Sequence, residues 1–308
     1  MRVLVTGAAG FIGSHLTQTI LREGHEVWAA VLPGESTRRL AQIHDQVRIE
    51  LIDLQKSSEV KELASRANPD CCVHLAWYVV PGKYWNSPEN LRCVSMSLGL
   101  AEALAAAGCR RMVGVGTCAE YDWDHELLSE DATPLRPRTL YGACKNATRQ
   151  ILEVFCGQAG MSFAWGRYFF LYGPGEKAQR LVPAVVCSML RGEPARLNSG
   201  TQVRDFLHVQ DVAAATWAVA KSALTGPVNI GSGEPVRTGA IVETIARIIG
   251  GHPRVDWGAI PDGPRDVPVL AADVRKLRQA TNWKPAYSLD EGLRDTVEWW
   301  KDHQDEGA

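Results

Sequence analysis

Several features that mark whole classes of protein are absent from this 308-residue sequence. No hydrophobic run is long enough to span a membrane. The 33 lysines and arginines nearly balance the 35 aspartates and glutamates, so a net charge of −2 gives no electrostatic reason to expect nucleic acid or an anionic membrane as a partner. The first residues enter a strand-like run without the anatomy of a signal peptide. We therefore expect a cytoplasmic protein that binds neither nucleic acid nor membrane.

Closely spaced cysteine motifs are also absent from the sequence. The eight cysteines form no Cys-x-x-Cys pair, and the eight histidines have no ligand spacing with one another or with the cysteines. In a chain of this length, isolated cysteines are typical of buried free thiols in a cytosolic protein. We expect no disulfide framework and no metal site.

The first half of the chain alternates short β-branched runs with helical stretches. Strands are predicted at 3–6, 26–31, 47–51, 71–76, 111–116 and 162–167, and helices at 11–23, 57–67, 91–107 and 140–157. Such alternation, with near-continuously apolar strands, predicts an α/β fold in which a doubly wound parallel sheet is covered on both faces.

The second half is less regular and richer in proline and glycine. Helices are predicted at 181–191, 209–222, 238–249 and 288–303. We expect a dinucleotide-binding domain over residues 1–169 and a smaller substrate domain over residues 170–308, partly interleaved with the first.

A glycine-rich turn follows the first strand. Gly7, Gly10 and Gly13 stand between that strand and the first helix, with Phe11 and Ile12 inside the motif. A tight turn, close approach of the backbone to a pyrophosphate and close helix–strand packing all require glycine, and the helix N-terminus attracts the phosphates. In this strand–turn–helix setting the motif predicts a Rossmann-type dinucleotide site.

The adenosine end of that site lacks an expected group. An acidic residue that binds the ribose of NAD should lie about 20 residues further on, where the second strand ends, but none is there. A 2′-phosphate is then tolerated, and Arg38 and Arg39 could neutralise it; the alternative for both arginines is an exposed helix start. We expect NADP, with NAD as the alternative. Asp53, followed by Leu54, is placed after the third strand to meet the adenine amino group.

Tyr141 and Lys145 are the strongest candidates for chemistry. They are four residues apart on a predicted helix and so share one face. An ammonium group beside a phenol lowers the pKa of the phenol, which can then exchange a proton with a substrate oxygen. Thr117 ends an apolar run upstream and could hold the same oxygen. These three side chains could catalyse the interconversion of an alcohol and a ketone if a hydride carrier is bound nearby.

The motifs, taken in order, resemble the extended short-chain dehydrogenase/reductase family, in its nucleotide-sugar epimerase, dehydratase and reductase group. The resemblance covers nearly the whole chain. It rests on residues 6–13, on His74-Leu75-Ala76, on Thr117, on Tyr141 to Lys145, and on the later segments 167–174, 204–209, 229–231 and 283–299.

The resemblance implies roles for further residues. Leu75 and Ala76 would border the nicotinamide half of the cofactor, and Lys145 would also hold the nicotinamide ribose. Arg204 and Arg265 would contact the substrate diphosphate. Phe170 stands where the family usually has an asparagine that serves the same sugar diphosphate. The family also implies a homodimer.

Departures from the family pattern argue against two of the family's reactions, dehydration and C3/C5 epimerisation. The dehydratases of this group have Asp-Glu directly after the threonine, whereas this chain has Cys118 and Ala119. A histidine that serves C3/C5 epimerisation in one member of the family is also absent, because Gly175 to Lys177 occupy that segment. The family's helix asparagine corresponds to Cys93.

Together these features predict NADPH-dependent reduction of the C4 keto group of a nucleotide-diphosphate-linked keto-deoxy sugar, or of another small carbonyl substrate. The alternative is an NAD-dependent nucleotide-sugar 4-epimerase, which uses the same trio. A third interpretation is a non-catalytic NAD(P)-sensing protein, but such proteins commonly lose the tyrosine or the lysine.

Overall fold

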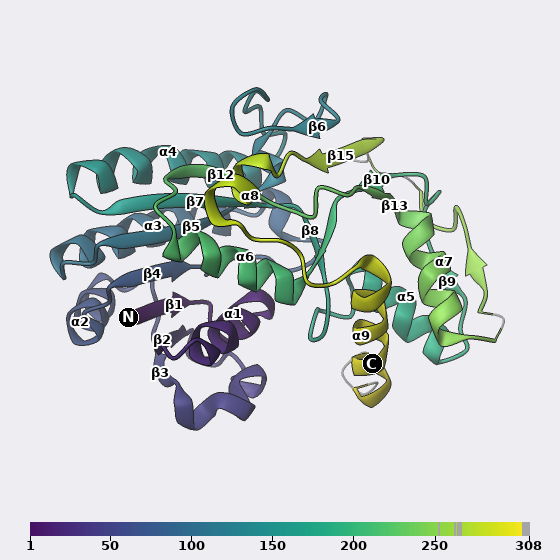
Figure 1. Cartoon of the computed structure of the whole chain (residues 1–308), viewed down its shortest axis with the longest axis horizontal. Helices are drawn as coiled ribbons and strands as arrows, with labels where there is room; N and C mark the ends of the chain where they lie inside the picture. The colour runs from purple at the N-terminus through teal and green to yellow at the C-terminus, as the bar shows by residue number, and fades with distance from the viewer. Residues whose placement is uncertain (252, 262, 264–266, 304–308) are drawn as a thin grey trace.

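The computed structural model describes residues 1–251, 253–261, 263 and 267–303. Its larger lobe is built on a seven-stranded, all-parallel sheet with the order β12-β7-β5-β4-β1-β2-β3 (Figure 1). The strands are β1 (Arg2–Thr6), β2 (Glu26–Val31), β3 (Arg48–Leu51), β4 (Cys71–His74), β5 (Arg111–Thr117), β7 (Ser162–Tyr168) and β12 (Gly226–Ile230).

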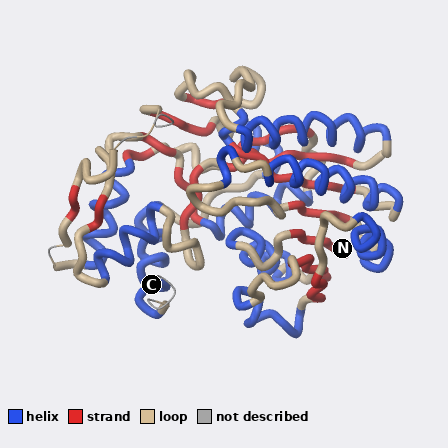
Figure 2. The backbone as a smooth tube through the Cα atoms, turned by 180° about the vertical axis from the view of Figure 1, so that it is seen from behind, coloured by secondary structure: helices blue, strands red, loops and turns tan. Residues whose placement is uncertain are grey.

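Helices cover both faces of this sheet. One face carries α1 (Phe11–Arg22), α6 (Val209–Lys221) and α8 (Arg275–Thr281), and the other carries α2 (Ser57–Ala67), α3 (Glu89–Ala106) and α4 (Leu140–Gln158) (Figures 1 and 2). Because successive side chains of a strand point to opposite faces, Val3 and Val5 join the first core while Leu4 joins the second. Burial on both sides explains why the strands are apolar almost without interruption.

The strand order creates a switch point. From β1 the chain winds outward to β2 and β3 on one side, then returns to β4 and winds outward on the other side. In open parallel sheets, ligands bind outside the carboxyl ends of the strands at such a point. The predicted α/β fold of Rossmann type is confirmed, and the switch point falls between β1 and β4.

A smaller lobe lies beside the sheet and has its own core (Figure 1). Its helices are α5 (Leu181–Leu190), α7 (Thr238–Ile249) and α9 (Leu289–Asp302). Its short strands are β8 (Phe170–Tyr172) with β11 (Phe206–His208), β9 (Ala195–Arg196) with β14 (Val255–Asp256), and the sheet β13 (Val236–Arg237), β10 (Val203–Arg204), β15 (Val269–Ala272) and β6 (Leu127–Leu128). The sequence did not predict these short strands.

The chain passes between the lobes more than once. β12 and α6 come from beyond residue 170 but belong to the large sheet and its cover, whereas β6 comes from before residue 170 and pairs with β15. A division at residues 169 and 170 therefore remains our prediction for the domains, with these segments as its interleaved pieces. Three short 3₁₀ segments complete the fold: η1 (Arg38–Gln46), η2 (Tyr84–Asn86) and η3 (Cys118–Glu120).

All eight cysteines are buried and unpaired, as the sequence predicted. Among the described residues, no three histidine, cysteine, aspartate or glutamate side chains gather as a metal site. No helix in the described part of the chain is both long and apolar enough to cross a membrane.

Candidate active site

The glycine turn has the geometry that a pyrophosphate requires. Gly7 has a φ of 68°, and a Cβ atom on it would lie 3.0 Å from the Ala76 nitrogen. A Cβ on Gly13 would lie 2.1 Å from the Gly7 oxygen, so a side chain at either position is excluded. Gly10 precedes α1 and provides no side-chain cap for the first N–H groups of the helix. A backbone cradle at an uncapped helix N-terminus fits the diphosphate of a dinucleotide.

The segment after β4 lies against this turn. The Leu75 N–H donates to the Thr6 carbonyl (3.2 Å), and the Ala76 N–H donates to the Thr6 hydroxyl (3.3 Å). His74 bridges the Thr6 and Ser97 hydroxyls at 2.7 and 2.9 Å, and burial lowers the pKa of His74 to about 3. A neutral histidine thus joins β1, β4 and α3, and the fold brings the predicted cofactor residues after β1 and β4 together.

The adenosine end is only partly as expected. Asp53 follows β3, and one of its carboxylate oxygens accepts the Gln55 N–H at 3.0 Å. Arg38 is exposed at the start of η1. Arg39 is engaged elsewhere, because its guanidinium donates twice, at 3.2 and 2.8 Å, to the Gly175 carbonyl in the loop after β8. Arg38 therefore remains a prediction for binding a 2′-phosphate.

The trio meets where α4 begins. Thr117 ends β5, and Thr139 caps α4 by accepting the Gly142 N–H at 3.1 Å. A Cβ on Gly142 would lie 2.3 Å from the Ala119 carbonyl, so glycine there allows α4 to approach η3 closely. This approach sets Tyr141 beside Thr117.

Tyr141 lies among aromatic rings. The rings of Trp77, Tyr84 and Trp85 pack edge-on against it, with centroids 6.5, 4.9 and 5.9 Å away. Burial raises the pKa of Tyr141, Tyr84 acts in the same direction, and a hydrogen bond with Thr117 opposes them. Tyr141 is therefore a phenol at neutral pH.

Lys145 does not lower the pKa of Tyr141 as the sequence predicted. Its Nζ donates to the Val115 carbonyl at 2.6 Å and lies 6.0 Å from the centroid of the Tyr141 ring. Burial lowers the pKa of Lys145 to about 7, against the effects of Cys93 and Glu120. The expected lowering of the pKa of Tyr141 is wrong for this arrangement, because desolvation dominates and the ammonium group is directed toward Val115.

Glu120 is a site residue that the sequence analysis missed. One carboxylate oxygen accepts the Thr117 N–H and the Trp165 indole N–H, both at 2.9 Å, and the other accepts the Arg167 Nε at 2.8 Å. Glu120 and Arg167 are almost completely buried. The signal was present, because a threonine followed three residues later by glutamate is the pattern of a capping box, which these two residues form. Glu120 fixes the backbone that carries the Thr117 hydroxyl.

Asn90 is a second missed residue. The sequence directed attention to Cys93, whose sulfur accepts the Tyr78 N–H at 3.4 Å. Asn90 is fully buried at the start of α3, and its amide makes three hydrogen bonds to the segment that carries the aromatic rings.

The predicted substrate residues lie on the smaller lobe's side of the site. The guanidinium carbon of Arg204 is 5.5 Å from the centroid of the Phe170 ring. Arg204 is buried, donates to the Val203 carbonyl at 2.8 Å, and moderates the pKa of Cys118, which burial raises to about 12. Phe170 and Arg204 thus reach the Thr117 end of β5, whereas Arg265 lies outside the described residues.

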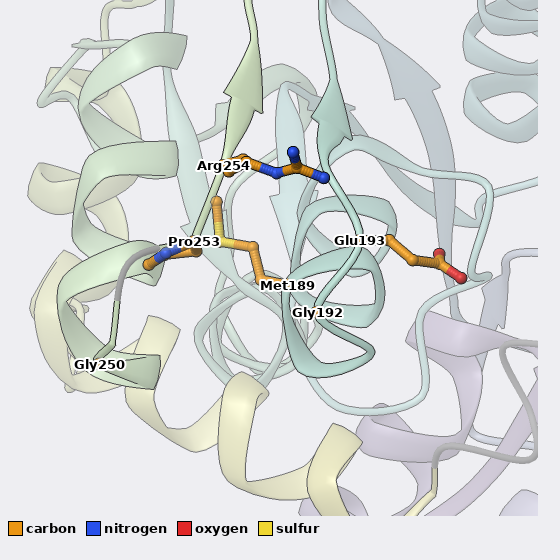
Figure 3. A pocket seen from close by; sticks show the side chains of 6 residues that line it. All are labelled: Met189, Gly192, Glu193, Gly250, Pro253 and Arg254. Carbon is orange, nitrogen blue, oxygen red and sulfur yellow. The ribbon is translucent and has the colours of Figure 1, made fainter.

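Two surface hollows do not coincide with the trio. One is lined by Val80, Pro81, Gly82, Lys177 and Gln179, so it lies between the aromatic segment and the loop after β8. The other is lined by Met189, Gly192, Glu193, Gly250, Pro253 and Arg254, in the smaller lobe (Figure 3). None of the predicted site residues lines either hollow, so neither hollow marks the position of the trio.

Comparisons with known proteins agree with this geometry. Residues 3–231 match the model of the NAD dependent epimerase/dehydratase family. A UDP-glucuronate 4-epimerase of Thermodesulfobacterium geofontis is 26% identical, over 97% of this chain and 96% of that protein. The crystal structure of the Thermus thermophilus UDP-glucose 4-epimerase with NAD has a TM-score of 0.86 and 28% identity, over 98% of this chain and 99% of that one.

A solved structure of MoeE5 in complex with UDP-glucuronic acid and NAD is also similar. It has a TM-score of 0.85 and 33% identity, over 98% of this chain and 100% of that one. Fold, glycine turn, trio and full-length similarity agree, and the chain therefore belongs to the NAD-dependent epimerase/dehydratase family, the nucleotide-sugar enzymes of the extended short-chain dehydrogenase/reductase type.

Proposed function

We propose that this enzyme reduces the C4 keto group of a nucleotide-diphosphate-linked keto-deoxy sugar with NADPH. The observation that supports this most is the pairing of Tyr141 with Thr117. The two side chains share a hydrogen bond, so a proton donor and a hydroxyl that can orient a carbonyl oxygen lie together. Cys118 and Ala119 stand beside Thr117 where an eliminating enzyme needs an acid and a base.

Each residue of the site has a part in this proposal. The bound cofactor supplies a hydride to the ketone carbon. Thr117 orients the ketone oxygen, and Tyr141 donates its proton to that oxygen as the alcohol forms. Lys145 holds the nicotinamide ribose, which Leu75 and Ala76 border. The aromatic rings exclude water from the proton transfer.

The glycine turn and its helix hold the pyrophosphate in this proposal. Gly7, Gly10 and Gly13, with Phe11 and Ile12, supply backbone N–H groups. Asp53 and Leu54 meet the adenine. Arg38 neutralises the 2′-phosphate of NADP, because no carboxylate at the end of β2 opposes it.

On the substrate side, Arg204 and Arg265 contact the diphosphate. The guanidinium group suits phosphate oxygens because its donors form a fixed fork. Phe170 replaces an amide with an aromatic face, so the nucleotide-diphosphate contacts differ in detail from those of relatives that have asparagine there.

A 4-epimerase is the second candidate. It is favoured by relatives named 4-epimerases that match the chain over nearly its full length, one of them solved with NAD. An epimerase must first remove a proton from a C4 hydroxyl, which requires a phenolate. The positive charge of oxidised nicotinamide, if bound at the site, would favour that form of Tyr141.

The two candidates differ in net redox change. The purified enzyme would be mixed with NADPH and a 4-keto-6-deoxy sugar linked to dTDP, UDP, GDP or CDP, while NADPH absorbance is followed. In parallel, nucleotide released by denaturing the protein would be identified. We expect substrate-dependent loss of NADPH with one of the four nucleotides, and no stoichiometric NAD.

Stoichiometric bound NAD, with interconversion of C4 epimers and no NADPH consumption, would replace the reductase by the epimerase. Cofactor binding without turnover of any carbonyl or alcohol substrate would instead favour the non-catalytic interpretation.

We also propose that the enzyme is a homodimer through α3 and α4. These helices lie side by side on one face of the sheet (Figure 2). On α4, the side chains of Ile151 and Val154 are 47% and 62% exposed. Exposed apolar side chains on α4, beside α3, suit a partner helix pair, which the family resemblance also implies.

A further inference from the structure

Trp77 covers the amino group of Lys145. The Nζ of Lys145 lies 3.8 Å from the centroid of the Trp77 ring, whereas the Trp165 and Tyr141 rings are 5.8 and 6.0 Å away. The negative face of an indole attracts a cation, most strongly where water is excluded, and Lys145 is only 3% exposed. Trp77 is therefore the nearest aromatic face to this ammonium group.

The indole is fixed from its other edge. The Trp77 Nε1 donates to the Asn90 Oδ1 at 2.8 Å. The Asn90 Nδ2 donates in turn to the Tyr84 and Ser87 carbonyls at 2.7 and 2.9 Å. Both side-chain polar atoms of Asn90, Oδ1 and Nδ2, are therefore hydrogen-bonded, and the residue is fully buried. Asn90 thus holds the Trp77 ring in the orientation that covers Lys145.

The other groups that face Lys145 do not replace Trp77. In the described part of the chain, the Val115 carbonyl is the acceptor of the Lys145 amino group. Glu120 and Cys93 favour its charged form from η3 and α3, but Glu120 is already shared among Thr117, Trp165 and Arg167. His74 on β4 is neutral and Tyr141 on α4 is a phenol.

We propose that Trp77 is a positioning residue for Lys145: its indole face, fixed by Asn90, holds the Lys145 ammonium group at the carboxyl end of β5. The inference rests on the proposed role of Lys145 in holding the nicotinamide ribose. Trp77 itself acts through Lys145 and needs no contact with the reacting atoms.

The expected effect has a defined sign. Lys145 binds the ribose in its charged form, so cofactor affinity should fall as pH rises through the pKa of Lys145. Replacing the indole by an apolar side chain keeps Lys145 covered but removes the ring face that favours its charged form, so this pKa should fall further. The loss of affinity should then begin about one pH unit lower.

The test is a titration of NADP and NAD binding against pH. We compare the full-length protein with Trp77→Leu, Trp77→Phe and Asn90→Ala, and with Trp257→Leu as a matched control. Trp257 is 44% exposed in the smaller lobe. Trp77→Leu should move the high-pH loss of affinity down by about one unit, with about tenfold weaker binding just above neutral pH. Trp77→Phe keeps a ring face, so its pH of affinity loss should lie between those of the parent and Trp77→Leu. Asn90→Ala should lower this pH as well. Trp257→Leu should lose affinity at the same pH as the parent.

Lys145→Ala separates this inference from the function on which it rests. If Lys145→Ala leaves cofactor binding unchanged at every pH, the proposed role of Lys145 fails. If Lys145→Ala weakens binding but Trp77→Leu and Trp77→Phe keep the parent's pH dependence, Trp77 only fills space and the inference is overturned. The inference is also overturned if cofactor binding to the Trp77 variants weakens equally at all pH values.

Discussion

At the scale of single residues, the protonation states of Tyr141 and Lys145 determine which proton transfers the trio can carry out. Tyr141, Lys145 and Thr117 are brought together, but burial acts on each ionisable group more strongly than its neighbours do. The phenol is held protonated, and the amine has a pKa of about 7. The phenol is the form of Tyr141 that can give a proton, whereas removing a proton from a substrate requires the phenolate.

The first prediction concerns the proton donor. Tyr141→Phe should lower kcat by about 10² to 10⁴-fold, because a positioned acid contributes about that much. The dissociation constant for the cofactor should stay within about twofold of the parent, since phenylalanine keeps the ring contacts with Trp77, Tyr84 and Trp85. Steady-state kinetics and cofactor titration measure the two effects.

Tyr287→Phe is the control, because Tyr287 packs on His208 and is not part of the trio. Near-parental turnover in Tyr141→Phe would exclude Tyr141 as the proton donor.

At the scale of elements, the junction of β5 and η3 carries the site. Thr117 begins a capping box with Glu120, and the Glu120 carboxylate is buried against Arg167 from the adjacent strand β7. Gly116 leaves the necessary space, since a Cβ there would lie 2.2 Å from the Glu120 carboxylate. A buried ion pair of this kind fixes geometry, while its net effect on stability depends on both partners being present.

The second prediction concerns this ion pair. Arg167→Met should lower the free energy of unfolding by about 3–5 kcal/mol, because Glu120 is then left as a buried charge without its partner. Adding Glu120→Gln to that variant should restore part of the loss. Urea unfolding measures the difference.

Arg66→Met removes a more exposed ion pair with Glu50 and should cost less than about 1 kcal/mol. Equal losses in Arg66→Met and Arg167→Met would show that burial of the Glu120–Arg167 pair has no energetic consequence.

At the scale of the whole molecule, the parallel sheet decides where ligands bind and which helices remain outside. The switch point falls between β1 and β4, and the smaller lobe lies beside the sheet (Figure 1). α3 and α4 lie side by side on the face opposite α1 and α6, so their outer surfaces are available to a second copy.

The third prediction tests that association. Ile151→Asp combined with Val154→Asp should convert the proposed dimer to a monomer, because two charges would be buried at the interface without partners. Sedimentation velocity measures the mass. Ile260→Asp changes an apolar side chain that is 50% exposed in the smaller lobe and should leave the mass unchanged. A monomeric parent protein would refute the dimer.

The sequence by itself determined the α/β class, the glycine turn and the Tyr141–Lys145 pair, because these depend on local periodicity and on spacing along one element. Most helix ends were predicted within two residues for the same reason. The exchange of β6 and β12 between the lobes, the role of Asn90 and the direction of the Tyr141 pKa were decided only by the tertiary structure. Each depends on contacts between residues far apart in the chain, and desolvation depends on everything packed around a group. Trp77 shows the difference most clearly: in sequence it is one aromatic residue among many, and only folding sets its ring over Lys145.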